Sequence, residues 1–279
     1  MRMYQGFRQC GKGISRMSIL AVALTLICLV GGVHTLVFAQ GTAQRGVSLD
    51  RWGDIILGQP DFKEVAINET TGDKVWDPGG VLVDESFNPP RMWVYDTNGR
   101  VLGLQLSNPV SEAYQYSATV AIGQTSVNSS TCNGDSSFQN GYPVPSASTL
   151  CAQNVKQLSI TEAPSTVNMA LDSQGRLYVP DQWNNRVLVY NNPWNDRVAD
   201  RVWGQSGFDK GINLAHFGCN RGQGDVATSN TICFQTDVGD GSGYAGGSPG
   251  VYVDPWDNLW VADTMNHRVQ VLQRAGGAK

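Results

Sequence analysis

The stretch 250-GVYVDPWDNLWVADTMNHRVQVL-272 decides the fold of this chain. Three short runs of β-branched and aromatic residues are typical of β-strands, and Asp, Pro and Asn between them favour tight turns. The stretch also holds Asp254, Asp263, His267 and Arg268. These residues could form a metal site or an acid/base site, or they could build turns. Comparison with the rest of the chain distinguishes these possibilities.

The chain contains two further copies of this stretch. Residues 168–190 align with it without a gap, and residues 80–104 align with three residues inserted before the second aspartate and one missing after it. In each copy one aspartate ends the first strand, another ends the second and an arginine follows. These are Asp84, Asp96 and Arg100; Asp172, Asp181 and Arg186; and Asp254, Asp263 and Arg268. Because the set recurs, we expect it to build turns in every unit, with His267 at the polar turn position of Asn185.

A second signature lies between the copies. Gly-Gln follows an apolar run within residues 54–62, 118–127 and 200–209. Two long connections, 125–154 and 206–248, each contain two cysteines in the same place relative to the next copy. This predicts the disulfides Cys132–Cys151 and Cys219–Cys233, each worth roughly 3 kcal/mol in the chain-entropy model. The C-x2–4-C spacing of a zinc site does not occur.

These units resemble the NHL-repeat family, whose core reads roughly G-V-A-V-D-x-x-G-N-L-Y-V-A-D-x-x-N-x-R-V-x-V-F. Residues 250–272 match this pattern almost throughout, and "ILGQPDF" and "ASTLCAQN" resemble connections in exported bacterial members. The resemblance implies an all-β fold, a β-propeller of four-stranded blades, with about three blades in residues 54–279. It implies no particular activity, because the family includes scaffolds, receptors and a metal-dependent lyase.

The N-terminal residues predict export. Residues 1–39 combine basic residues with an apolar run from Ile19 to Val33, and they form either a cleaved signal peptide or a membrane anchor through residues 19–38. Residues 40–53 are a linker under both interpretations, and both place the rest of the chain outside the cytosol. The formal net charge of −4 argues against nucleic-acid binding, which rewards Lys and Arg.

Three functional interpretations remain open. The first is an exported, non-enzymatic scaffold that binds protein, peptide or glycan through the two long loops. The second is a metal-dependent hydrolase or lyase, although the exported part contains only His216 and His267. The third is a part of a larger NHL array. We expect no cofactor; the one calcium candidate, Asp237 and Asp240, lacks the full D-x-D-x-D-G spacing.

The number of units raises the question of closure. Propellers usually have four to eight blades, and three repeats fall short of that. We therefore expect that two chains pair into a six-bladed homodimer, or that further blades belong to the protein.

Overall fold

The computed structural model describes residues 53, 55–59, 61–63, 69–107, 116–135, 137–152, 166–237 and 244–273. All of them belong to the compact unit from Gly53 to Lys279. The predicted export segment, residues 1–39, lies outside the described residues, and so does Asp240. Within the part that the structure describes, no helix is long and apolar enough to cross a membrane.

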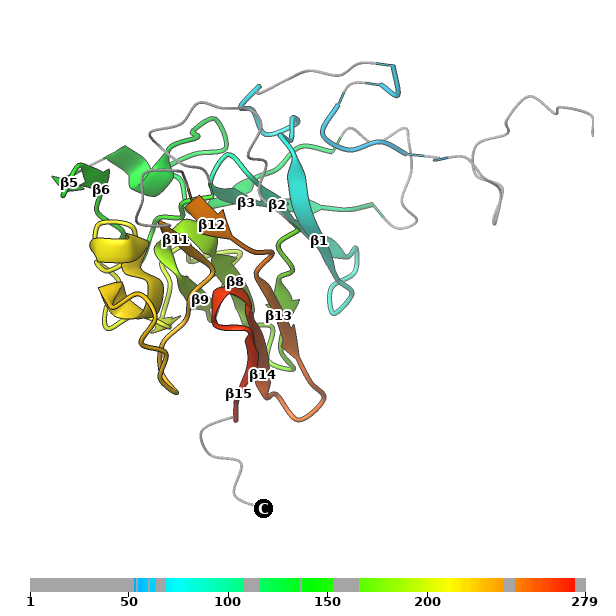
Figure 1. Cartoon of the computed structure of the whole chain (residues 1–279). Coiled ribbons are helices and arrows are strands. Elements are labelled where there is room, and N and C mark those ends of the chain that lie inside the picture. Colours follow the sequence, from blue (N-terminus) through cyan, green and yellow to red (C-terminus); the bar gives the residue numbers. More distant parts are fainter. Residues whose placement is uncertain are drawn as a thin grey trace, which may run out of the picture. The chain divides into compact units, whose positions relative to one another are not determined.

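Three small antiparallel sheets follow one another along the chain, and each is a simple meander (Figure 1). The first contains β1 (Pro78–Asp84), β2 (Arg91–Asp96), β3 (Arg100–Gln105) and β4 (Val120–Ile122). The second contains β7 (Ala170–Leu171), β8 (Leu177–Asp181), β9 (Arg186–Tyr190) and β10 (Arg201–Trp203), and the third β13 (Gly250–Val253), β14 (Leu259–Asp263) and β15 (Arg268–Leu272). The prediction of a mostly β chain is confirmed, and the described residues do not form a closed propeller.

The long connections between the sheets carry only short elements. Two hairpins, β5 (Phe138–Gln139) with β6 (Tyr142–Pro143) and β11 (Gln235–Asp237) with β12 (Tyr244–Gly246), lie there. The 3-10 turns are η1 (Cys132–Asp135) and η3 (Ala215–Gly222) in the loops, and η2 (Gln182–Asn184) and η4 (Thr264–Asn266) between the second and third strands of their sheets.

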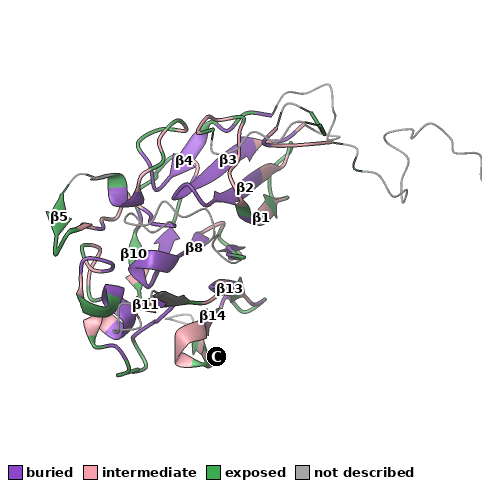
Figure 2. Ribbon diagram, turned by 45° about the horizontal axis from the view of Figure 1, so that its top comes forward, coloured by how far each residue is buried: buried purple, intermediate pink, exposed green. Residues whose placement is uncertain are grey.

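Neighbouring sheets pack face to face. Trp93, Tyr95 and Val101 of the first sheet share an apolar core with Leu177 and Val179 of the second. A second core joins the other face of the second sheet to β13 and β14. The middle strands β2, β3 and β8 are consequently buried along nearly their whole length (Figure 2).

Backbone hydrogen bonds link the beginnings of the three sheets. The amide of Val167 donates to the carbonyl of Gly79 at 2.9 Å, and that of Val251 donates to the carbonyl of Asn168 at 3.2 Å. The backbone at Gly80 lies so close to the backbone of Val167 that a Cβ on residue 80 would be 2.1 Å from the carbonyl oxygen of Val167. The first strands of successive sheets therefore lie side by side.

The third sheet leaves an apolar face uncovered by the described residues. Tyr252, Trp260, Val269 and Val271 on this face are 60%, 40%, 64% and 44% exposed. On the far face of the first sheet, Val81 and Val83 are also exposed, although Ile55 and Leu57 pack against the rest of that face. Each sheet in the series thus has two apolar faces, and those at the ends of the series are only partly covered.

The Gly-Gln pairs hold equivalent positions in the structure. Gly58, Gly123 and Gly204 have φ angles of 87°, 89° and 91°. The side-chain amides of Gln124 and Gln205 donate to the carbonyls of Gly99 and Asn185, at 2.9 and 3.0 Å, at the tip of the neighbouring turn. Glycine is needed because only it adopts this φ without strain and admits the side chain packed above it.

We predict that Gly123→Ala lowers the free energy of unfolding by about 2–4 kcal/mol, because the new Cβ meets strain and overlap. That Cβ would lie 2.6 Å from the side chain of Leu150. Gly175→Ala is the matched control, since Gly175 also has a positive φ, 75°, but a Cβ at this position would meet no atom within 4 Å. Urea unfolding should show a loss of only about 1 kcal/mol for the control. Equal losses would contradict the packing role of Gly123.

Candidate functional site

The repeated aspartates and arginines form ion pairs at the turn after the second strand of each sheet, and the aspartate of every pair is buried. Asp181 accepts from Arg186 Nε at 2.7 Å with one carboxylate oxygen and from the backbone amide of Cys151 at 2.8 Å with the other. Arg186 also donates to the carbonyls of Ser146 and Thr149 at 3.0 and 2.8 Å. The pair therefore ties the turn to the preceding long loop.

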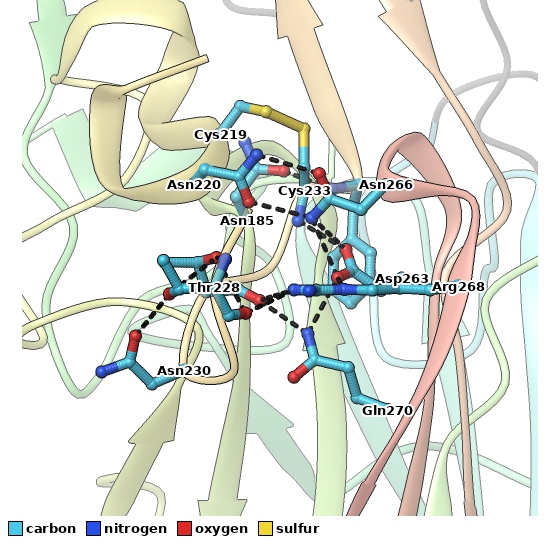
Figure 3. A network of polar contacts seen from close by, with 12 residues as sticks. Asn185, Cys219, Asn220, Thr228, Asn230, Cys233, Asp263, Asn266, Arg268 and Gln270 are labelled. Carbon is cyan, nitrogen blue, oxygen red and sulfur yellow. Dashed lines mark hydrogen bonds and ion pairs between the residues drawn. A yellow bond between two sulfur atoms is a disulfide. The ribbon is translucent and has the colours of Figure 1, made fainter. Parts of the chain in front are cut away.

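The third sheet repeats this arrangement (Figure 3). Asp263 accepts from Arg268 Nε at 2.7 Å and from the amide of Cys233 at 2.7 Å. Arg268 donates to the carbonyls of Thr228 and Thr231 at 2.6 and 2.9 Å, the counterparts of Ser146 and Thr149. In the first sheet, Arg100 Nε donates to Asp96 at 2.8 Å. One geometry thus serves three turns.

The residue before each arginine adopts a left-handed backbone conformation. The φ angles are 75° at Gly99, 50° at Asn185 and 53° at His267. Glycine and asparagine tolerate this region well, which explains their use at the turn. His267 therefore occupies the same turn position as Asn185.

Burial affects the protonation of the turn aspartates. It raises the pKa of Asp96 and of Asp181 above the ordinary aspartate value, while the adjacent guanidinium and backbone amides act in the opposite direction. In each carboxylate one oxygen accepts from the paired arginine and the other accepts from a backbone amide. Such groups are poorly placed to accept a proton from a substrate.

Both predicted disulfides, Cys132–Cys151 and Cys219–Cys233, are present. Disulfides persist in oxidising compartments, so the chain belongs outside the cytosol. The second cysteine of each pair also donates its backbone amide to Asp181 or Asp263. The second cysteine of each long loop is therefore held in two ways: by the disulfide and by the hydrogen bond of its amide to the aspartate of the ion pair.

The calcium candidate is only partly described. Asp237 lies 3.0 Å from Nδ1 of His216, and both side chains are partly exposed, whereas Asp240 lies outside the described residues. No group of three His, Cys, Asp or Glu side chains that could hold a metal ion occurs in the described ranges.

A pocket of about 340 Å³ lies between the first and second sheets, at the ends of the strands away from the disulfide loops. Its walls come from the β1–β2 turn, the β7–β8 turn and the segment after β9. Asp84, Phe87, Arg91, Trp93, Gln174 and Trp194 are among its lining residues. None of the lining residues belongs to 125–154 or 206–248, the loops in which the sequence predicted a binding surface.

Aromatic rings hold a guanidinium at this pocket. The Cζ atom of Arg91 lies 3.7 Å from the ring centre of Phe87 and 4.3 Å from that of Trp194. Trp194 in turn meets Trp93 edge to face, with ring centres 5.5 Å apart. Gly103 beneath them leaves room for this pair, because a Cβ there would lie 2.7 Å from Trp93.

In the second and third sheets, the aspartate at the end of the first strand accepts hydrogen bonds from two side chains as well as from backbone amides. Asp172 accepts from Arg176 Nε at 2.5 Å and from the Tyr178 hydroxyl at 3.0 Å. Burial and the neighbouring Asp172 raise the pKa of Tyr178 to about 12, so this hydroxyl stays protonated and able to donate well into the alkaline range.

Asp254 accepts in the same way, from Asn258 Nδ2 at 2.9 Å and from Trp260 Nε1 at 3.0 Å. Burial raises the pKa of Asp254, but the hydrogen bonds from Trp260 and Asn258 outweigh this effect and lower it overall.

The first sheet departs from this pattern at the pocket. Arg91 and Trp93 correspond to Arg176 and Tyr178, but among the described residues Asp84 accepts from the amide and hydroxyl of Ser86 and not from these two side chains. The buried Arg91 Nε and Trp93 Nε1 have no hydrogen-bond partner among the described residues. Sequence reasoning missed these two residues; the signal was the insertion between Asp84 and Arg91, which breaks the repeat.

We predict that Arg186→Met lowers the free energy of unfolding by about 3–5 kcal/mol, because it leaves the charge of Asp181 buried and unpaired. Arg201→Met is the control: Arg201 is exposed on β10, and its replacement should change stability by less than about 0.5 kcal/mol. Urea unfolding measures both. A loss at Arg186 no larger than that at Arg201 would contradict the structural role of the ion pair.

Comparisons with known proteins assign no family to this chain. No protein-family model matches the sequence, and no curated protein matches it.

Proposed function

We propose that this chain is an extracytoplasmic, non-enzymatic binding protein. In this proposal the three sheets are blades of an NHL-type propeller, which form a rigid frame, and the ligand is a protein, peptide or glycan. Two disulfides and the buried ion pairs support the assignment of a rigid frame outside the cytosol.

The observation that carries the proposal is the pocket between the first and second sheets. It combines an aromatic wall, a guanidinium and two donors without partners among the described residues. Ligand sites usually combine an apolar wall with a few polar groups that fix orientation. A buried donor without an acceptor costs about 1–3 kcal/mol, so a ligand that supplies the acceptor gains that free energy on binding.

The repeated carboxylates support binding over catalysis. Asp172, Asp181, Asp254 and Asp263 each accept two or more hydrogen bonds from neighbouring groups of the frame. A general base needs an oxygen free to take a proton from the substrate. The His216–Asp237 pair is separate from the pocket, because neither residue lines it.

The proposal predicts that the purified, oxidised chain binds members of a glycan or peptide array, and that Phe87→Ala weakens this binding at least about 10-fold. Phe87 is 43% exposed and lines the pocket, so its loss removes one wall while leaving the cores intact. Loss of a well-placed aromatic contact of this kind costs about 1–2 kcal/mol or more.

Phe138→Ala is the matched control, because Phe138 is 62% exposed in the loop 125–154 and distant in sequence from the pocket walls. It should leave binding unchanged. If Phe138→Ala weakened binding and Phe87→Ala did not, the ligand would lie on the disulfide loops. If no array member bound, the proposed function would be wrong.

A further inference from the structure

The second and third sheets show which kind of group satisfies the donors that correspond to Arg91 and Trp93. In the second sheet, one carboxylate oxygen of Asp172 receives both Arg176 Nε and the Tyr178 hydroxyl. In the third sheet, one oxygen of Asp254 receives both Asn258 Nδ2 and Trp260 Nε1. In both repeats a carboxylate therefore accepts from two side chains that are two positions apart at the start of the second strand.

The first sheet keeps these donors but displaces the carboxylate. Arg91 follows Asp84 by seven positions, whereas Arg176 follows Asp172 and Asn258 follows Asp254 by four. Asp84 shares with Asp172 and Asp254 the hydrogen bond from the amide two positions on, but no carboxylate of the described residues lies within ion-pair distance of Arg91. The charge of Asp172 on the opposite wall is paired with Arg176.

We propose that the pocket binds a carboxylate-bearing sugar, a hexuronic acid, whose carboxylate accepts from Arg91 and Trp93 as Asp172 and Asp254 accept in the other sheets. This inference rests on the proposed function and names its ligand class. Guanidinium–carboxylate hydrogen bonds are among the strongest in proteins, and a planar fork matches a planar carboxylate.

The remainder of the pocket favours a sugar over a simple acid. Gln174, Asn191 and Asn192 line the pocket and are exposed, and their side-chain amides both donate and accept, as sugar hydroxyls require. The rings of Phe87 and Trp194 give the pocket an apolar wall for the C–H face of a pyranose. A volume of about 340 Å³ is at the small end of ligand pockets and suits one or two sugar rings.

The indole N–H of Trp93 provides a direct test. In a ¹H–¹⁵N correlation spectrum of the oxidised chain, Trp93→Phe identifies its indole signal by loss of one peak among the eight tryptophans. Glucuronate and galacturonate should shift this peak, because the N–H gains an acceptor. The indole signal of Trp260, already bonded to Asp254, is the internal reference and should stay in place.

Affinity measurements on variants test the same contact. Arg91→Gln should weaken uronate binding about 10- to 100-fold, the loss expected for one charge-assisted hydrogen bond. Arg201→Gln, at an exposed position on β10, should leave binding unchanged. Thermal melting establishes that both variants are folded. Gln174→Ala, at the exposed rim of the pocket and outside the core, should also weaken uronate binding.

The outcomes of these experiments distinguish a failure of this inference from a failure of the proposed function. Glucose or galactose binding as well as the uronates, or an Arg91→Gln variant with unchanged affinity, would overturn the carboxylate contact. A shift of the Trp93 signal by an acidic peptide and by no uronate would overturn the sugar assignment, while binding as such would stand. Array ligands that leave the Trp93 signal in place would overturn the pocket as their site.

Discussion

The structure depends on one repeated ion pair. In each sheet a buried aspartate at the end of the second strand pairs with the arginine that begins the third strand. In the second and third sheets the aspartate also accepts the amide of a disulfide cysteine, and the arginine reaches two carbonyls of the preceding loop. Burying two charges is costly, so much of the loss expected on removing the arginine is the penalty of leaving the carboxylate buried and unpaired. Here the pair sets where each long loop meets its sheet.

The same constraint explains why chemistry is hard to place in the repeated positions. A carboxylate whose two oxygens both accept hydrogen bonds from the turn cannot also bind a substrate without weakening the turn. The side chains that could meet a ligand therefore occur where the repeat is broken, at the inserted β1–β2 turn. Asp84 bonds locally there, and Arg91 stacks on Phe87 and Trp194 instead of pairing with a carboxylate.

Much of the frame could be predicted from the sequence, because it depends on patterns that recur. The three copies of the Asp–Arg stretch located the three sheets, and the equal placement of cysteines predicted both disulfides. The pocket could not be predicted in this way. Its walls come from residues 84–93 and 171–194, which become neighbours only when two sheets pack. That Arg91 Nε and Trp93 Nε1 lack an acceptor among the described residues also depends on this packing and not on the sequence pattern. The sequence predicted a binding surface in the long loops from their length and composition alone.

One link between the second and third sheets has a consequence for the pocket. The amide and hydroxyl of Ser173, which lies in the pocket wall, donate to the carboxylate of Asp257 in the β13–β14 turn, at 2.9 and 2.6 Å. The wall that faces Arg91 is thus braced by a sheet that does not itself line the pocket. A fragment that contains only the first two sheets would keep every side chain that lines the pocket. It would lose the hydrogen bonds from Ser173 to Asp257. The smallest piece of the chain that preserves the pocket's rigidity accordingly includes the third sheet.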